Sequence, residues 1–126
     1  MSGVSVDLAS PTPAPDRGVA IVWGLLARYP YGGVTWQAMH HLAALRRLGF
    51  DVWYVEDSDS RVYSPTTHCP TMEFEENVAF LERWMGSLGM PDRWIFRPPG
   101  EGGAPIVADE RELERLYSRA EVVLNL

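Results

Sequence analysis

Short continuous apolar runs alternate along the chain with stretches in which apolar residues have helical spacing. Residues 18–25 form an unbroken apolar run with several β-branched members, which predicts a strand covered on both faces. Residues 34–48 then place apolar side chains on one helical face, and Gly49 follows as a stop. Residues 51–55 read as a second strand. The first half is therefore predicted to be a strand–helix–strand unit.

The second half repeats this alternation. Thr71 is predicted to cap a helix whose buried stripe ends near Leu88, and Gly89 closes it. Residues 93–97 give a short strand, and the pair Asp109 and Glu112 forms a capping-box pattern at the start of a third helix. A last strand spans 121–125.

Four strands alternating with three helices predict an α/β fold with right-handed crossovers. We expect a Rossmann-like three-layer domain with a mostly parallel sheet, ordered third–second–first–fourth. Residues 1–17 are rich in Pro, Ala and Ser and are interpreted as a flexible leader, so the domain spans 18–126. Because the sequence stops within one residue of the last strand, we expect an incomplete domain, a fragment without its second domain.

Composition narrows the function classes. The 126 residues carry a formal charge of -6, and no basic cluster that would bind nucleic acid is present. The single cysteine allows no disulfide within the chain, which fits a cytoplasmic protein. No apolar run is long enough for a membrane span, and the amino-terminus lacks a signal peptide. His40 and His41 are adjacent in a helix and point about 100° apart, so no metal site is predicted.

Candidate chemistry lies where the carboxyl ends of the strands meet. Four segments converge there: 26–33, the loop that opens with Glu56, 98–103, and Asn125. Gly32 and Gly33 precede a helix, where free amides and the helix dipole favour a phosphate or carboxylate. A tight turn with positive φ explains the two glycines equally well. Neither a dinucleotide fingerprint nor a P-loop is present.

The stretch RYPYGGVTWQ, residues 28–37, followed by HLAALRRLGFDVWYV, residues 41–55, resembles the amino-terminal half of a GT-B glycosyltransferase. In the glycogen-synthase-like and sucrose-synthase-like branches, a Gly-Gly turn follows the first strand and the helix ends in L-x-x-x-G-H-x-V. The matching residues here are Gly32, Gly33, Leu45, Gly49 and Val52, while Phe50 replaces the histidine.

This resemblance implies one half of a two-domain enzyme. The amino-terminal domain would hold the sugar acceptor, and its Gly-Gly turn would approach the diphosphate of a nucleotide-sugar, a co-substrate held by the missing carboxy-terminal domain or a partner subunit. No other cofactor is implied. The candidate binding residues are Gly32, Gly33, Arg28 and Glu56. Residues 26–31 lack the histidine base of inverting members, which favours a retaining mechanism or a degenerate domain.

Two alternatives remain open. Glu56, at the end of the second strand, could bind ribose hydroxyls in a dinucleotide-dependent oxidoreductase. Alternatively, Trp36 and Met39 lie on the predicted outer face of the first helix and could form the surface of a non-catalytic interaction module.

Overall fold

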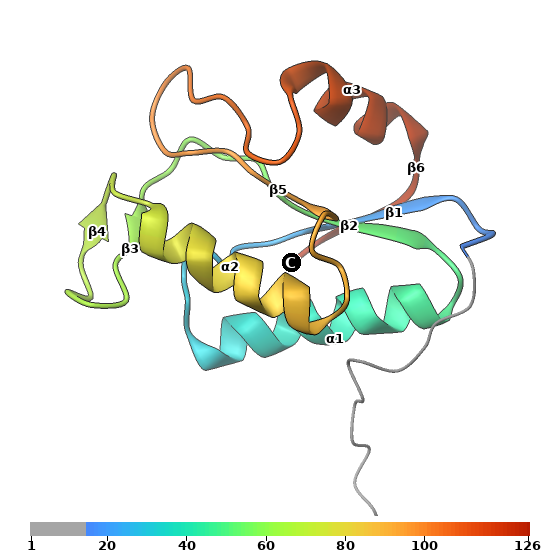
Figure 1. Cartoon of the computed structure of the whole chain (residues 1–126), viewed down its shortest axis with the longest axis horizontal. Coiled ribbons are helices and arrows are strands. Elements are labelled where there is room, and N and C mark those ends of the chain that lie inside the picture. Colours follow the sequence, from blue (N-terminus) through green and yellow to red (C-terminus); the bar gives the residue numbers. More distant parts are fainter. Residues whose placement is uncertain (1–14) are drawn as a thin grey trace, which may run out of the picture.

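A parallel four-stranded sheet forms the centre of the protein in the computed structural model, which describes residues 15–126 (Figure 1). Its strands are β1 (Val19–Trp23), β2 (Asp51–Glu56), β5 (Trp94–Phe96) and β6 (Ala120–Asn125). Their order is β5-β2-β1-β6, and every neighbouring pair is parallel. The predicted α/β class and strand order are therefore confirmed.

The three helices lie on both faces of this sheet and give a Rossmann-like three-layer domain. α1 (Gly32–Arg47) and α2 (Glu75–Ser87) cover one face, and α3 (Glu110–Arg119) covers the other (Figure 1). Within β1, Ala20 and Val22 belong to the α1/α2 core, whereas Ile21 packs with Leu113 and Leu116 of α3. Burial on both faces explains why β1 is a continuous apolar run.

α1 is buried on two sides, and this corrects one expectation. Met39, predicted to lie on the outer face of the first helix, is 0% exposed, and its neighbour Ala43 is 6% exposed, because α2 packs beside α1. Trp36 remains 48% exposed and meets the ring of Trp84 edge-on, with centroids 5.8 Å apart. Met39 therefore cannot contribute to an interaction surface, while Trp36 can.

The segment before α2 also differs from the prediction. It contains a small antiparallel hairpin, β3 (Val62–Tyr63) and β4 (Pro70–Thr71), where the sequence predicted only loop. α2 begins at Glu75 without a side-chain cap, so the predicted capping by Thr71 is wrong. Thr71 instead ends β4, and its Oγ1 accepts a hydrogen bond of 3.1 Å from the Glu73 amide.

Other predicted helix boundaries are confirmed. Gly49 and Gly89 end α1 and α2 with φ of 97° and 73°, values that favour glycine. Asp109 caps α3 by accepting a 2.8 Å hydrogen bond from the Glu112 amide. Most of the predicted leader lies outside the described residues, but the Asp16 amide donates to the Gly49 carbonyl at 2.9 Å.

Candidate functional site

The loops at the carboxyl edge of the sheet are joined by hydrogen bonds that the sequence could not specify. The Tyr63 amide donates to the Arg28 carbonyl at 2.8 Å, which attaches the hairpin to the β1–α1 loop. The Gly100 amide donates to the Asp59 carbonyl at 2.9 Å, which attaches the 98–103 loop to the segment after β2. The predicted convergence is therefore observed for the 26–33 loop, the segment after β2 and the 98–103 loop.

Arg28 and Glu56 form a buried ion pair at this edge. Glu56 ends β2, and its Oε1 accepts hydrogen bonds from the Arg28 amide at 3.1 Å and from Arg28 Nη1 at 3.3 Å. Its Oε2 accepts from the Ala27 amide and from the Tyr54 hydroxyl, both at 2.6 Å. Because Arg28 and Glu56 are 0% and 1% exposed, they form the floor beneath the β1–α1 loop.

The guanidinium of Arg28 also connects the neighbouring loops. Its Nε donates to Ser60 Oγ at 3.1 Å, and Nη2 donates to the carbonyls of Ser58 and of Arg97, the latter at 2.7 Å. Its planar face lies 4.7 Å from the centre of the Phe96 ring. All three guanidinium nitrogens are therefore engaged within the protein.

Burial dominates the electrostatics of this network. It raises the pKa of Glu56, against the opposing effect of the hydrogen bonds from Tyr54 and Ala27 and of the Arg28 charge. Burial beside the Glu56 carboxylate also holds the pKa of Tyr54 well above its usual value. Tyr54 therefore stays protonated. Its hydroxyl donates a hydrogen bond to Glu56 Oε2, and its oxygen accepts a hydrogen bond from the Leu26 amide at 2.8 Å. The network fixes three consecutive amides of the loop.

Gly32 and Gly33 are the first two residues of α1, which begins two residues before the predicted start. Neither has a positive φ, and a Cβ built on either would meet nothing within 4 Å. The turn geometry therefore does not explain these glycines. Tyr31 stands at the N-cap without a side-chain hydrogen bond, and no acidic residue occupies the first turn. The positive end of α1 is accordingly open and uncompensated.

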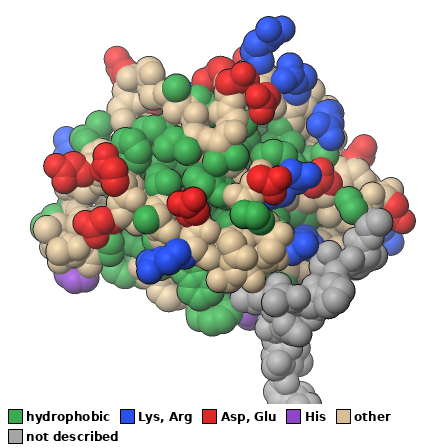
Figure 2. Space-filling model, viewed as in Figure 1, with side chains coloured by type: hydrophobic (Ala, Val, Ile, Leu, Met, Phe, Trp, Pro, Cys, Tyr) green, Lys and Arg blue, Asp and Glu red, His purple; other side chains and the backbone are tan. Residues whose placement is uncertain are grey.

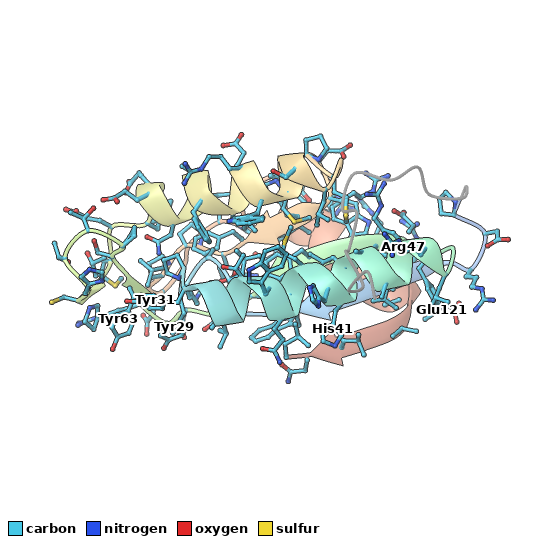
Figure 3. All side chains as sticks on the ribbon, turned by 90° about the horizontal axis from the view of Figure 1, so that it is seen from below. Tyr29, Tyr31, His41, Arg47, Tyr63 and Glu121 are labelled. Atoms are coloured by element: carbon cyan, nitrogen blue, oxygen red, sulfur yellow. The ribbon has the colours of Figure 1, made fainter. Side chains whose placement is uncertain are left out.

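Three tyrosines that the sequence analysis did not single out lie beside this helix start. Figure 3 places Tyr29, Tyr31 and Tyr63 together at that end of α1, whereas His41 lies halfway along the helix. The rings of Tyr29 and Tyr63 are 5.2 Å apart, and Tyr29 and Tyr31 are 36% and 41% exposed. The pattern RYPY before the glycines was the available indication.

A cavity of about 290 Å³, here named the α2 cavity, opens at the start of α2. It is lined by Ser64, Thr66, Thr67, Thr71, Glu73, Glu75, Glu76 and Asn77. Figure 2 shows acidic side chains on the left of the molecule, where α2 begins. Sequence reasoning missed this cavity because its wall depends on the β3–β4 hairpin.

A second polar network, centred on Arg97, joins the end of β2 to α3. Arg97 Nε donates to Asp57 Oδ1 at 2.6 Å, and its Nη2 donates to Glu110 at 2.6 Å, which lowers the pKa of that carboxyl. The Tyr117 hydroxyl donates to Asp57 Oδ2 at 2.8 Å. Burial, together with this hydrogen bond, raises the pKa of Tyr117 to about 12. These groups attach α3 to the end of β2.

The chain matches no protein-family model, no curated protein and no solved structure at a significant level. Its class is therefore defined by its architecture alone. It is a Rossmann-like α/β domain, and the candidate sites described above lie at the carboxyl edge of its parallel sheet. Among residues 15–126, no group of three His, Cys, Asp or Glu side chains is arranged to hold a metal ion. No helix in that range is long and apolar enough to cross a membrane.

Proposed function

We propose that the domain is the acceptor-side half of a GT-B glycosyltransferase, in which the start of α1 receives the diphosphate of a nucleotide-sugar. The observation that carries this proposal is the pair Gly32 and Gly33. The fold itself does not need glycine at either position, since φ is ordinary and the space around each Cβ is empty. Close approach of a ligand to the backbone is the remaining physical reason for two glycines.

The charges around α1 support an anionic ligand. Its first turn has no acidic residue and no cap, so the amides and the helix dipole face outward without compensation. The turn is also held rigidly, because Glu56 accepts hydrogen bonds from the Ala27 and Arg28 amides. In this proposal Arg28 and Glu56 position the turn, and the amides of the α1 start contact the diphosphate.

The donor half is supplied by a carboxy-terminal domain or a partner subunit, and the sugar-nucleotide is a co-substrate. Without that half, we expect diphosphate binding and no turnover. The absence of a histidine in residues 26–31 favours a retaining reaction, which needs no base at that position. A cytoplasmic location fits a lone cysteine and a nucleotide-sugar substrate.

The test is a titration of the full chain with uridine diphosphate and adenosine diphosphate, followed by backbone amide resonances. We expect saturable shifts at Gly32, Gly33 and Val34. Gly33→Asp should weaken binding, because a carboxylate in the first turn repels the diphosphate. Gly86→Asp is the matched control, since Gly86 is also an exposed helical glycine with an unobstructed Cβ position but lies on α2. Equal weakening by both variants, or no shift at α1, would refute the diphosphate site.

A dinucleotide-dependent oxidoreductase has less support. Its ribose ligand would be Glu56, whose two oxygens already accept four hydrogen bonds within the protein, from Arg28 (two), Ala27 and Tyr54. Binding ribose there would require the buried network to open. Saturable binding of NADH with shifts at β2 would favour this alternative over the transferase.

A further inference from the structure

The wall of the α2 cavity includes a residue with a buried oxygen that has no hydrogen-bond partner. Asn77 is 1% exposed, and its Nδ2 donates to the carbonyls of Ala27 at 2.7 Å and Tyr63 at 2.8 Å. Two acceptors on one side fix the orientation of the amide group. Its Oδ1 has no hydrogen-bond partner, although Asn77 lines the cavity. Buried oxygens of this kind are costly, so Oδ1 calls for a donor from a molecule in the cavity.

The rest of the wall offers both acceptors and donors. The carboxylates of Glu73, Glu75 and Glu76 are acceptors, and Glu76 already accepts from Thr66 Oγ1 at 2.9 Å. Ser64 Oγ accepts from the amides of Thr66 and Thr67, at 3.2 and 3.1 Å, which leaves its proton available as a donor. The uncapped first turn of α2 adds further donors at the same place.

This mixture decides the class of ligand. An anion cannot donate to Asn77 Oδ1 and is repelled by the carboxylates, whereas an ammonium group cannot accept from the helix amides. A metal ion likewise cannot accept a hydrogen bond from the helix amides. In residues 15–126, moreover, no three acidic side chains are arranged to hold one. A hydroxyl both donates and accepts, so several hydroxyls on one neutral molecule satisfy every part of the wall.

We infer that the α2 cavity binds a neutral polyhydroxylated ligand, a sugar, through Asn77 Oδ1, the Glu73 carboxylate and the Thr67 hydroxyl. Its identification with the acceptor site rests on the proposed function. The bond from Asn77 Nδ2 to the Ala27 carbonyl places the cavity directly beside the loop that leads to the α1 glycines. Since the loop that contains Ala27 leads to the α1 glycines, we expect a sugar in the cavity to face the same edge as a diphosphate on α1, which is the arrangement that transfer to a hydroxyl needs.

The experiment titrates the full chain with glucose, glucose 6-phosphate and glucosamine, followed by backbone and Asn side-chain amide resonances. We expect glucose to shift Thr67, Thr71 and Asn77 saturably, and glucose 6-phosphate to bind more weakly. Preference for glucose 6-phosphate would overturn the proposal. Binding of glucosamine alone would also overturn it, because that result identifies a cation site.

Two exposed positions test the wall without disturbing the fold. Glu73→Gln and Thr67→Val should each weaken glucose binding about fivefold, the effect of one hydrogen bond. The matched control is Glu82→Gln on α2, an exposed carboxylate outside the cavity, which should leave the affinity unchanged. Unchanged binding in both cavity variants would show that the sugar lies elsewhere.

The two proposals fail separately. Glucose binding at α2 without diphosphate binding at α1 would refute the proposed transferase function and identify the protein as a sugar-binding domain. Diphosphate shifts at Gly32 and Gly33 without any glucose response would leave the transferase and remove only this acceptor site.

Discussion

The starts of α1 and α2 both lack a side-chain cap, but their first turns carry opposite chemistry. α1 follows β1 of the central sheet and α2 follows the β3–β4 hairpin, yet the two starts are linked, because Asn77 of α2 donates to the carbonyl of Ala27 in the loop before α1. Glycine occupies the first turn of α1, whereas Glu75 and Glu76 occupy that of α2. The difference teaches that backbone geometry supplies the free amides, while the first-turn side chains decide whether an anion or a neutral donor fits them.

The start of α3 shows that open helix ends are not general in this chain. Asp109 Oδ1 accepts from the Glu112 amide at 2.8 Å, and Arg97 binds Glu110 in the same turn. The positive end of α3 is thus satisfied by side chains. α1 and α2 differ from α3 in having no such cap, and only these two adjoin the features proposed to bind ligands.

The largest effect is expected from breaking the floor beneath α1. Glu56→Gln removes a charge that balances Arg28 and replaces one acceptor oxygen by an amide NH2 group, a donor that would face other donors. Because both partners are buried, we expect a loss of about 3–5 kcal/mol in the free energy of unfolding. Urea denaturation measures the loss, and amide exchange at Ala27 and Arg28 should rise with it.

Glu110→Gln is the control for this change. Glu110 also pairs with an arginine, at 2.6 Å, but its side chain is 56% exposed. Solvent screens such a pair, so the free energy of unfolding should change far less than in Glu56→Gln. Similar losses in both variants would mean that burial does not distinguish the two networks.

A smaller effect is expected where a helix start is closed by its own cap. Asp109→Ala removes the acceptor for the Glu112 amide and should cost about 1 kcal/mol in the free energy of unfolding. Tyr31→Ala at the N-cap of α1 removes no capping hydrogen bond and should cost less. Denaturation of both variants by urea gives the comparison, which would be contradicted by a greater loss at Tyr31.

The hydrophobic pattern predicted the sheet order and the helices because each element buries a face with its own period. The unbroken apolar run at Val19–Trp23 and the Gly49 and Gly89 stops all appear as expected. The pattern also brought Arg28 and Glu56 to the same edge of the sheet. The sequence analysis assigned both residues to ligand binding. In the structure they are buried against each other, which depends on how the loops fold and is not evident from the residue types alone.

The remaining differences come from contacts between distant segments. The burial of Met39 depends on where α2 packs, which a single helical period does not encode. The β3–β4 hairpin has two residues per strand, too few to show alternation, and it decides both the start of α2 and the wall of the α2 cavity. In the sequence, Asn77 looks like an ordinary helical asparagine. Only the fold shows that its Oδ1 is buried without a hydrogen-bond partner.

The α1 glycines allow a prediction of opposite sign for stability and binding. Gly33→Ala should raise the free energy of unfolding by up to about 1 kcal/mol, because alanine favours the helix and its Cβ meets no atom. The same change should weaken diphosphate binding. Gly49→Ala is the contrasting variant, since φ of 97° and a Cβ 2.7 Å from Asp16 Oδ1 make it destabilising. If Gly33→Ala bound the diphosphate as tightly as the unmodified protein, glycine at this position would not be needed for binding.

The smallest effect concerns two tyrosines that donate to carboxylates on either side of the edge, Tyr54 to Glu56 and Tyr117 to Asp57. Tyr117 has a folded-state pKa of about 12, above the ordinary value of 10.0, so its contribution to stability is complete below pH 10 and is lost as the pH rises through 12. Phenolate absorbance should show one late-ionising group that disappears in Tyr117→Phe, while Tyr54 ionises only as the protein unfolds. If Tyr117→Phe left the absorbance curve unchanged, Tyr117 would titrate like an exposed tyrosine, and its bond to Asp57 would not hold α3 in solution.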